Sequence, residues 1–185
     1  MPHPKVLDIS KIGLLVVDVQ EAFRAVINDF DEMAVRIAKI IRGFQVLDRP
    51  VIVTEQYSKG LGHTAEEIRS VLTSDFECVE KSAFSACRAS GFENRLKHVG
   101  IEQVVLCGLE THVCVNQTAH DLLELGFDVH LLTDCVASRS QDNKQTGLSK
   151  MFASGVVHSS VEMALFEMMS DSKHEKFREV QSLIK

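Results

Sequence analysis

The sequence contains no apolar run long enough to cross a membrane, no basic tract and no pair of cysteines in a CxxC spacing. A membrane-spanning helix needs about 20 consecutive apolar residues, whereas the first apolar stretch, residues 12–17, ends at Asp18. Lysine and arginine together number 20, against 26 aspartates and glutamates, which gives a net charge of −6. Without a basic tract to bind a phosphate backbone, nucleic acid is a poor first candidate for a partner.

The composition favours a single domain over residues 1–185, with 45% hydrophobic and 25% charged residues. These values exclude the disordered, collagen-like and disulfide-scaffold classes of protein. The five cysteines are an odd number and lie in or beside apolar segments, so we expect reduced thiols. Residues 1–5 lead into only a short apolar run, unlike a secretory signal. We therefore expect an intracellular, cytoplasmic protein, with import into an organelle left open.

Short apolar runs alternate with helical patterns along the chain, which is typical of a parallel sheet covered by helices on both faces. An uninterrupted aliphatic run such as residues 12–17 suits a strand that is buried on both sides. The predicted strands are residues 12–17, 51–54, 78–80, 103–107, 128–133 and 156–158. The predicted helices are residues 31–47, a short one from about 64, 114–125, 143–153, and two after 160, of which the last, 173–185, is expected to be peripheral.

Polar residues follow most of the predicted strands. Ligands of open α/β sheets bind beyond the carboxyl ends of the strands, in the crevice where the strand order reverses. Roughly half of such residues should only cap helices or turn the chain. The candidates are Asp18 and Gln20, residues 55–57, Lys81 and Ser82, residues 108–114, and Asp134.

Cys114 has the most suggestive position among the thiols, because it lies between a glycine-bearing turn and the first turn of a predicted helix. Free amides and the positive dipole end at a helix start lower the pKa of a thiol and can hold an oxyanion. We therefore expect Cys114 to titrate below the other four cysteines. The alternative is that Cys114 is a small buried filler, as most intracellular cysteines are. We keep that interpretation for Cys78, Cys107 and Cys135.

Asp18 and Lys81 are candidates for the base and the stabilising charge that a nucleophilic cysteine needs. Asp18 follows four aliphatic residues, so its carboxylate should emerge at the end of a buried strand, where desolvation helps it to accept a proton. Lys81, at the end of another strand, can stabilise both the aspartate and a thiolate. The alternatives are that Asp18 caps a turn and that Lys81 is a solvated surface charge.

Three separated motifs follow one another along the chain: LLVVDVQ at residues 14–20, EKSAFS at 80–85 and GLETHVCV at 108–115. With these motifs the chain resembles the isochorismatase-like cysteine hydrolases, a superfamily that also contains nicotinamidase and carbamoylsarcosine amidase. The resemblance runs in order from about residue 10 to about residue 170. Residues 54–64 and 134–140 look most like the isochorismatase-domain subgroup.

The resemblance implies a catalytic triad of Asp18, Lys81 and Cys114 in a three-layer α/β/α, Rossmann-like fold, with a six-stranded parallel sheet in the order 3-2-1-4-5-6. It implies that the Cys114 thiolate attacks a carbonyl carbon and that Asp18 passes the thiol proton to the leaving amine. Water assisted by Asp18 would then release the thioester. Backbone amides near Glu110 and Cys114 would form the oxyanion hole, and a cis peptide would join Leu109 to Glu110. Homodimers or larger assemblies are also implied.

Two departures from the family pattern narrow the expected activity. Nicotinamidases bind a metal through an aspartate and two histidines after the second strand, whereas this segment offers His63 with Glu55, so we expect no metal and no cofactor. Isochorismatases proper lack the nucleophilic cysteine, so Cys114 argues against vinyl-ether hydrolysis. Large apolar residues are more often core than ligand contacts, and His112 could equally pack in its turn. With that reservation, the candidate walls of a substrate pocket are Gln20, Phe23, Gln56, Tyr57, Phe84 and His112.

The leading hypothesis is a cofactor-free amidase or related hydrolase that acts on a small amide or acyl substrate, without a membrane or nucleic-acid partner. The second is a binding or scaffold protein that has kept the fold, and the intact Asp18, Lys81 and Cys114 argue against it. The third is a nucleic-acid-cleaving enzyme that uses Lys81, His112 and His63, and the net charge of −6 counts against it. The substrate stays open, because specificity depends on loop shape and pocket size.

Overall fold

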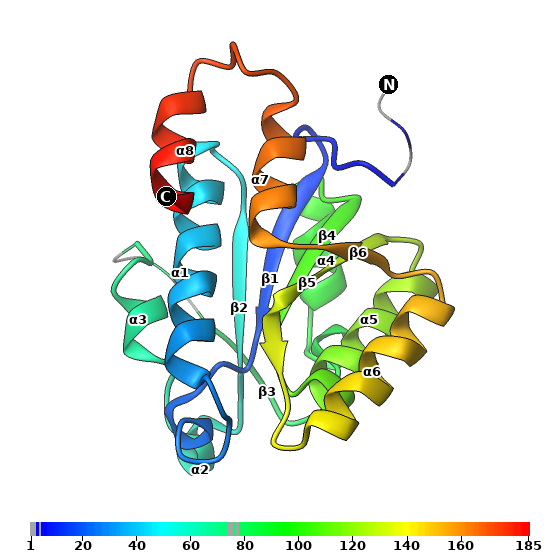
Figure 1. Cartoon of the computed structure of the whole chain (residues 1–185). Coiled ribbons are helices and arrows are strands. Elements are labelled where there is room, and N and C mark those ends of the chain that lie inside the picture. The colour runs from blue at the N-terminus through cyan, green and yellow to red at the C-terminus, as the bar shows by residue number, and fades with distance from the viewer. Residues whose placement is uncertain (1–2, 4, 74–75, 77) are drawn as a thin grey trace.

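The computed structural model describes residues 3, 5–73, 76 and 78–185. Its strands form one parallel sheet in the order β3-β2-β1-β4-β5-β6, with helices on both faces (Figure 1). The fold class and the strand order predicted from the sequence are therefore confirmed. The strands are β1 (Ile12–Val17), β2 (Val51–Gln56), β3 (Val79–Lys81), β4 (Gln103–Leu109), β5 (Asp128–Ala137) and β6 (Val157–Ser159).

The helices divide between the two faces of the sheet. One face is covered by α1, α3, α7 and α8, and the other by α4, α5 and α6. The helices are α1 (Phe30–Val46), α2 (Ser58–Leu61), α3 (Glu66–Arg69), α4 (Phe92–His98), α5 (Asn116–Glu124), α6 (Gln141–Ala153), α7 (Val161–Met169) and α8 (Phe177–Ile184). Single 3-10 turns span Glu21–Phe23 and Ala86–Arg88, and a π-helical turn spans Thr111–Val115.

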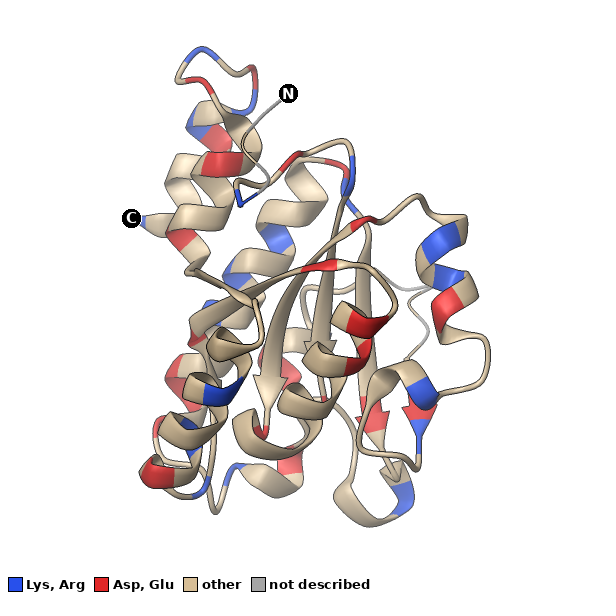
Figure 2. Ribbon diagram, turned by 90° about the vertical axis from the view of Figure 1, so that its right-hand side faces the viewer, with Lys and Arg blue, Asp and Glu red and all other residues tan. Residues whose placement is uncertain are grey.

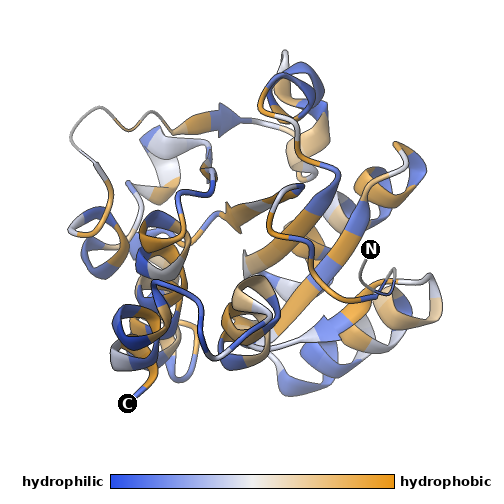
Figure 3. Ribbon diagram, turned by 90° about the horizontal axis from the view of Figure 1, so that it is seen from above, coloured by the Kyte–Doolittle hydropathy of each residue, from blue (hydrophilic) through white to orange (hydrophobic). Residues whose placement is uncertain are grey.

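Strand β1 is apolar at every position because both of its faces are covered. Leu14 and Val16 belong to the core beneath α1, whereas Leu15 and Val17 belong to the core beneath α5, as the alternation of side chains along a strand requires. Charged residues lie mostly on helices, loops and strand ends (Figure 2). The strands between the helices are largely apolar (Figure 3).

The strands that lead to the candidate site run further than the apolar runs that predicted them. β2 continues through Gln56, and β4 reaches Leu109. β5 extends to Ala137, past an irregularity in its pairing with β4 between Leu106 and Gly108. Pairing with a neighbouring strand keeps these residues extended whether or not their side chains are apolar, so hydrophobicity alone predicts the ends too early.

The C-terminal helix begins at Phe177 rather than at the predicted residue 173. In Figure 1 this red helix lies beside the upper half of α1. Its Val180 is fully buried in the core beneath α1, so one apolar side of a charged segment packs onto the domain. None of the helices among the described residues has both the length and the apolar character needed to span a bilayer.

Candidate active site

Three strands end at the same edge of the sheet and bring Asp18, Lys81 and Cys114 together. Asp18 follows β1, Lys81 is the last residue of β3, and Cys114 lies in the turn after β4. β1 and β4 are neighbours where the strand order reverses, which is where ligands of such sheets bind. The three residues are 1%, 5% and 7% exposed, so all of them are withdrawn from bulk water.

Asp18 and Lys81 form an ion pair in the interior. Nζ of Lys81 lies 2.6 Å from Oδ2 of Asp18, and the two side chains are 0% and 1% exposed. The other carboxylate oxygen, Oδ1, accepts a hydrogen bond of 2.6 Å from the hydroxyl of Thr54 on β2. Low-dielectric surroundings strengthen the attraction and make either charge costly without its partner. The alternative interpretation of Lys81 as a solvated surface charge is therefore wrong.

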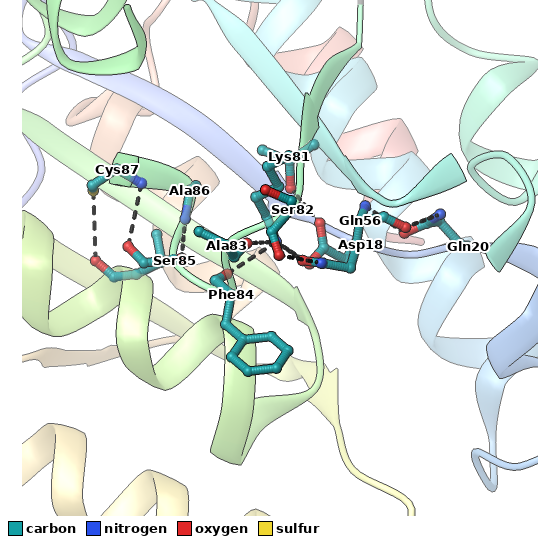
Figure 4. Close-up of polar contacts among 12 residues, drawn as sticks. Asp18, Gln20, Gln56, Lys81, Ser82, Ala83, Phe84, Ser85, Ala86 and Cys87 are labelled. Carbon is teal, nitrogen blue, oxygen red and sulfur yellow. Dashed lines mark hydrogen bonds and ion pairs between the residues drawn. The ribbon is translucent and has the colours of Figure 1, made fainter. Parts of the chain in front are cut away.

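Further acceptors surround the ammonium group of Lys81. It donates to Oε1 of Gln56 at 2.8 Å and to the backbone carbonyls of Ala83 and Phe84 at 3.2 and 2.9 Å (Figure 4). An ammonium group has three N–H donors, so Asp18 and these acceptors use all of them. Lys81 is thus fixed in position beside the carboxylate.

Gln20 and Gln56 are committed to protein partners instead of standing free on a pocket wall. Nε2 of Gln20 donates to the carbonyls of Gln56 and Gly62 at 3.1 and 2.6 Å, and its Oε1 accepts the N–H of Gln56 at 2.8 Å. Gln56 offers its own Oε1 to Lys81 and donates Nε2 to the carbonyl of Ser82 at 2.7 Å. Both amides therefore brace the chain around the ion pair.

The other predicted wall residues lie in different surroundings. Phe23 is half-buried and packs on the core beneath α1. Tyr57 and Phe84 are 59% and 52% exposed, and the ring of Phe84 points away from the ion pair in Figure 4. Nδ1 of His112 lies 3.0 Å from the hydroxyl oxygen of Ser138. Tyr57 and Phe84 thus present aromatic surface to solvent, whereas Phe23 and His112 are held by protein neighbours.

Cys114 is a neutral thiol at rest, which corrects the prediction of a lowered pKa. Burial, together with the negative charge of Asp18, raises the pKa of Cys114 to about 12, and the positive charge of Lys81 acts in the opposite direction. Burial also raises the pKa of Cys78 and of Cys87 to about 12, so Cys114 does not titrate below these two thiols. Burial raises the pKa of Cys107 and of Cys135 still further. Desolvation of the sulfur outweighs the helix start on which the prediction relied.

A glycine allows β4 to approach β1 beside Asp18. Gly108 has a φ of 118°, in the region that glycine favours, and a Cβ at this position would overlap the backbone carbonyl of Val17. Asp18 itself has a φ of 52°, and its carbonyl accepts the N–H of Gln20 at 2.9 Å. These two conformations turn the chain at the ends of β1 and β4. At this point the carboxylate of Asp18 lies close enough to Cys114 to affect the pKa of its thiol.

The peptide between Leu109 and Glu110 is trans, because no cis peptide bond occurs among the described residues. The predicted cis bond is therefore wrong: β4 stays paired through Leu109, and Glu110 continues the extended chain with φ −82° and ψ 143°. The Glu110 carbonyl accepts the N–H groups of Val113 and Val115 at 3.0 and 3.3 Å. An oxyanion hole formed by the amides of Glu110 and Cys114 stays a prediction.

The sequence did not single out two features that hold the site. Thr54 orients the carboxylate of Asp18, and its signal in the sequence is a hydroxyl at the end of the apolar run 51–54. The carbonyls of Ala83 and Phe84 bind Lys81. Backbone acceptors leave no mark on residue identity, so this second feature could not have been found from the sequence.

Glu55 and His63 lie together without a third metal ligand. Nδ1 of His63 is 3.2 Å from Oε2 of Glu55, while Oε1 of Glu55 accepts the N–H and the hydroxyl of Thr64 at 2.6 and 2.7 Å. Across residues 3, 5–73, 76 and 78–185, no group of three His, Cys, Asp or Glu side chains could hold a metal ion. A metal-free and cofactor-free reaction remains an expectation to be tested.

The sheet order and the buried carboxylate, ammonium and thiol at its reversal point define a doubly wound α/β protein with a thiol site at the switch point. The family model described as the Isochorismatase domain matches residues 13–163. The chain therefore belongs to the isochorismatase family and has its hydrolase fold.

Known relatives share this fold over nearly the whole chain. Isochorismatase domain-containing protein 2 of Danio rerio is 38% identical over 172 residues, which cover 92% of this chain and 85% of the relative. The solved structure of MAR1 ribonuclease from Caenorhabditis elegans is 37% identical, with a TM-score of 0.92 over 97% of this chain and 92% of its own. The YcaC gene product of Escherichia coli, described as an octameric hydrolase of unknown specificity, has a TM-score of 0.90 over 100% of this chain and 91% of its own. At 21% identity, YcaC shows the shared fold alone.

Proposed function

We propose that the protein is a cofactor-free cysteine hydrolase that cleaves a small amide or related acyl substrate, with Asp18, Lys81 and Cys114 as its catalytic triad. The observation that carries this proposal is the buried Asp18–Lys81 pair, whose two charges both act on the Cys114 thiol. A thiol nucleophile needs a base for its proton and a positive charge near the sulfur. Membership of the isochorismatase family supports the assignment to the hydrolases.

In the proposed reaction, Asp18 takes the proton of Cys114 as the sulfur attacks the carbonyl carbon. The developing negative charge moves to the substrate oxygen, where the backbone N–H groups of Glu110 and Cys114 would donate hydrogen bonds. Asp18 then gives its proton to the departing amine as the C–N bond breaks, which leaves a thioester on Cys114. Water that loses a proton to Asp18 hydrolyses this thioester, and the proton returns to the sulfur as the carboxylic acid leaves.

The raised pKa of Cys114 is consistent with a proton transfer from the thiol to Asp18 that occurs only when the substrate is bound. Because the thiol is neutral at rest, the thiolate would form as the carbonyl is attacked, and stray electrophiles would react slowly. The transfer moves negative charge from Asp18 to sulfur without changing the net charge of the site. Lys81, held by its acceptors, stabilises either negative group.

Two alternatives make different use of the same site. A binding or scaffold protein would gain little stability from the buried ion pair, because the cost of removing both charges from water offsets much of their attraction. The second alternative is a nucleic-acid-cleaving enzyme, because one similar solved structure is named as a ribonuclease. The net charge of −6 opposes it, and Lys81 has no N–H left for a phosphate. A small uncharged carbonyl group suits the site better than a phosphodiester.

A screen of small amides, ureido acids and thioesters against the parent protein and Cys114→Ala tests the proposal. We expect turnover together with an acyl adduct on Cys114 in the intact-protein mass, and the loss of both in the variant. Cys87→Ala removes a half-buried thiol elsewhere and should keep both. RNA cleavage that persists in Cys114→Ala would favour the nuclease, and ligand binding without any turnover would favour the scaffold.

We also propose that the protein is a homo-oligomer and that it is located in the cytoplasm, where thiols stay reduced. All five cysteines are free thiols, and a relative with the same fold is described as octameric. The exposed rings of Tyr57 and Phe84 offer apolar surface that a second copy could cover. Light scattering on the purified protein should show a mass of at least twice the 20.6 kDa of one chain, and a monomer at every concentration would contradict the assembly.

A further inference from the structure

A hollow of about 220 Å³ lies at the carboxyl end of β5. It is lined by Arg36 from α1, Arg139 from the loop after β5 and Lys144 from the first turn of α6. The starts of α1 and α6 both lie at the lower edge of the sheet in Figure 1. No member of the proposed triad is among the described residues that line this hollow, so it is a separate feature of the molecule.

The three cations keep N–H donors that no described residue accepts. Arg36 donates Nε to the carbonyl of Asp134 at 2.9 Å, and its Nη1 lies 3.5 Å from a carboxylate of its own helix, which leaves Nη2 without a partner. Arg139 donates Nε to Glu110 at 3.1 Å, which leaves both terminal nitrogens. The backbone N–H of Lys144 donates to the carbonyl of Ser140, whereas its ammonium group forms no hydrogen bond or ion pair with a described residue.

The two carboxylates that line the hollow, Asp134 and Asp29, compensate the positive charge of Lys144 only in part. Both carboxylate oxygens of Asp134 accept the N–H of Val161 at 3.2 Å, at the start of α7. Asp29 is exposed and forms no ion pair with a described residue. Burial and the positive charge of Arg36 lower the pKa of Lys144, against the opposing effects of Asp134 and Asp29. Arg36 and Lys144 therefore lie close enough at the hollow for their like charges to interact.

The first turn of α6 adds backbone donors on the same side. This helix has 13 residues, and Gln141 at its start lines the hollow. The hydroxyl of Ser140 accepts the N–H of Asn143 at 3.5 Å, which caps one of the free amides. The positive dipole end and the remaining amides of a helix start favour an anion, and here they act together with the side-chain cations.

We propose that this hollow binds a small anion, through a carboxylate or phosphate group held by Lys144, Arg36 and Arg139 at the start of α6. Guanidinium groups match the oxygens of carboxylate and phosphate, and a lysine adds a compact charge. Since a water molecule takes up about 30 Å³ in the liquid, the hollow suits an anionic group with a short chain rather than a polymer.

Hydrogen bonds connect the hollow with the turn that carries Cys114. Arg139 donates both its backbone N–H and its Nε to the carboxylate of Glu110, the residue before the turn. Ser138 lines the hollow, and its hydroxyl oxygen lies 3.0 Å from Nδ1 of His112 within the turn. An anion in the hollow therefore acts on residues that position Cys114, whether it is the acid group of the substrate or a separate effector.

Titration calorimetry of the whole protein with inorganic phosphate, and separately with malonate, tests the site at low ionic strength. We expect saturable binding that Lys144→Gln weakens about tenfold, because contacts to charged groups are the strong ones. The matched control is Lys150→Gln, which removes an exposed lysine from the last turn of the same helix and should bind like the parent. Arg36→Gln should also weaken binding, and thermal melting shows that each variant is folded.

Two results would overturn the site: no saturable binding of either anion, or an equal loss in Lys144→Gln and Lys150→Gln. Because binding is measured without turnover, this test does not depend on the proposed hydrolase activity. The same proteins identify the source of the anion. Competition between phosphate and a turned-over amide, with a raised KM and an unchanged kcat in Lys144→Gln, assigns the hollow to the substrate. A changed rate of Cys114 alkylation without competition assigns it to an effector.

Discussion

Two ionic clusters brace the segments that follow β1, one in the interior and one at the surface. Lys81 and Asp18 are 0% and 1% exposed in their side chains, whereas the side chain of Arg24 is 33% exposed. Water and salt screen the surface pairs, which are worth little. The interior pair has lost its water, so each charge depends on the other. The surface cluster pairs Arg24 with Glu21, Asp31 and Glu67.

The largest effect should come from breaking the interior pair on one side. Lys81→Met leaves the carboxylate of Asp18 buried without a counter-charge, and should lower the free energy of unfolding by roughly 3–5 kcal/mol. Chemical denaturation measures this loss. The double variant Asp18→Asn/Lys81→Met removes both charges and should regain most of the stability while amide turnover stays absent. If Lys81→Met were as stable as the parent, the carboxylate of Asp18 would not need its counter-charge, and the expected cost of an unpaired buried charge would be contradicted.

Removing the proposed base should affect turnover and the acidity of the Cys114 thiol in different ways. In Asp18→Asn, turnover should fall by at least about 100-fold, as is typical of lost acid–base catalysis. The carboxylate of Asp18 raises the pKa of Cys114 and Lys81 lowers it. The curve of iodoacetamide reaction rate against pH should therefore move to lower pH in Asp18→Asn and to higher pH in Lys81→Ala. Cysteine mapping by mass spectrometry follows Cys114, and a Lys81→Ala curve that matches the parent would remove Lys81 from the triad.

A smaller effect is expected at the hydroxyl that orients the carboxylate. Thr54→Val keeps the shape of the side chain but removes the donor to Oδ1 of Asp18, so the free energy of unfolding should fall by about 1–3 kcal/mol. We expect a reduced kcat with little change in KM, because the donor acts through Asp18. Thr54→Ser retains a hydroxyl and should restore most of kcat. If Val and Ser behave alike, packing at β2 matters more than the hydrogen bond.

The smallest effect should come from the surface cluster. Arg24→Gln should lower the free energy of unfolding by no more than about 1 kcal/mol. The difference from the parent should shrink at about 1 M salt, where screening reaches within a few ångströms. Denaturation at two salt concentrations measures it. A salt-independent loss as large as that of Lys81→Met would remove the distinction between the two clusters.

The parts of the site that could be predicted are those that depend on a local sequence pattern at the end of one strand. The aliphatic run 12–17 followed by a carboxylate is a local pattern, and it placed Asp18 correctly at the end of β1. Cys114 was also correctly placed after β4, on the turn that begins the next helix. The trans peptide before Glu110 and the raised pKa of Cys114 were missed. They depend on strand pairing and on burial by segments distant in the sequence.

The sequence by itself determined the parallel sheet, the order of its strands and the arrival of Asp18, Lys81 and Cys114 at one edge. Periodicity and residue type predict the parallel sheet, because each strand must hide its own apolar side chains. The strand order and the triad were implied by the family resemblance that the three motifs carry. Only the tertiary structure decided that Lys81 is buried on Asp18, 63 positions away in the chain, and that Gln20 and Gln56 brace this pair. The strength of a charge in a protein depends on which distant groups exclude water from it.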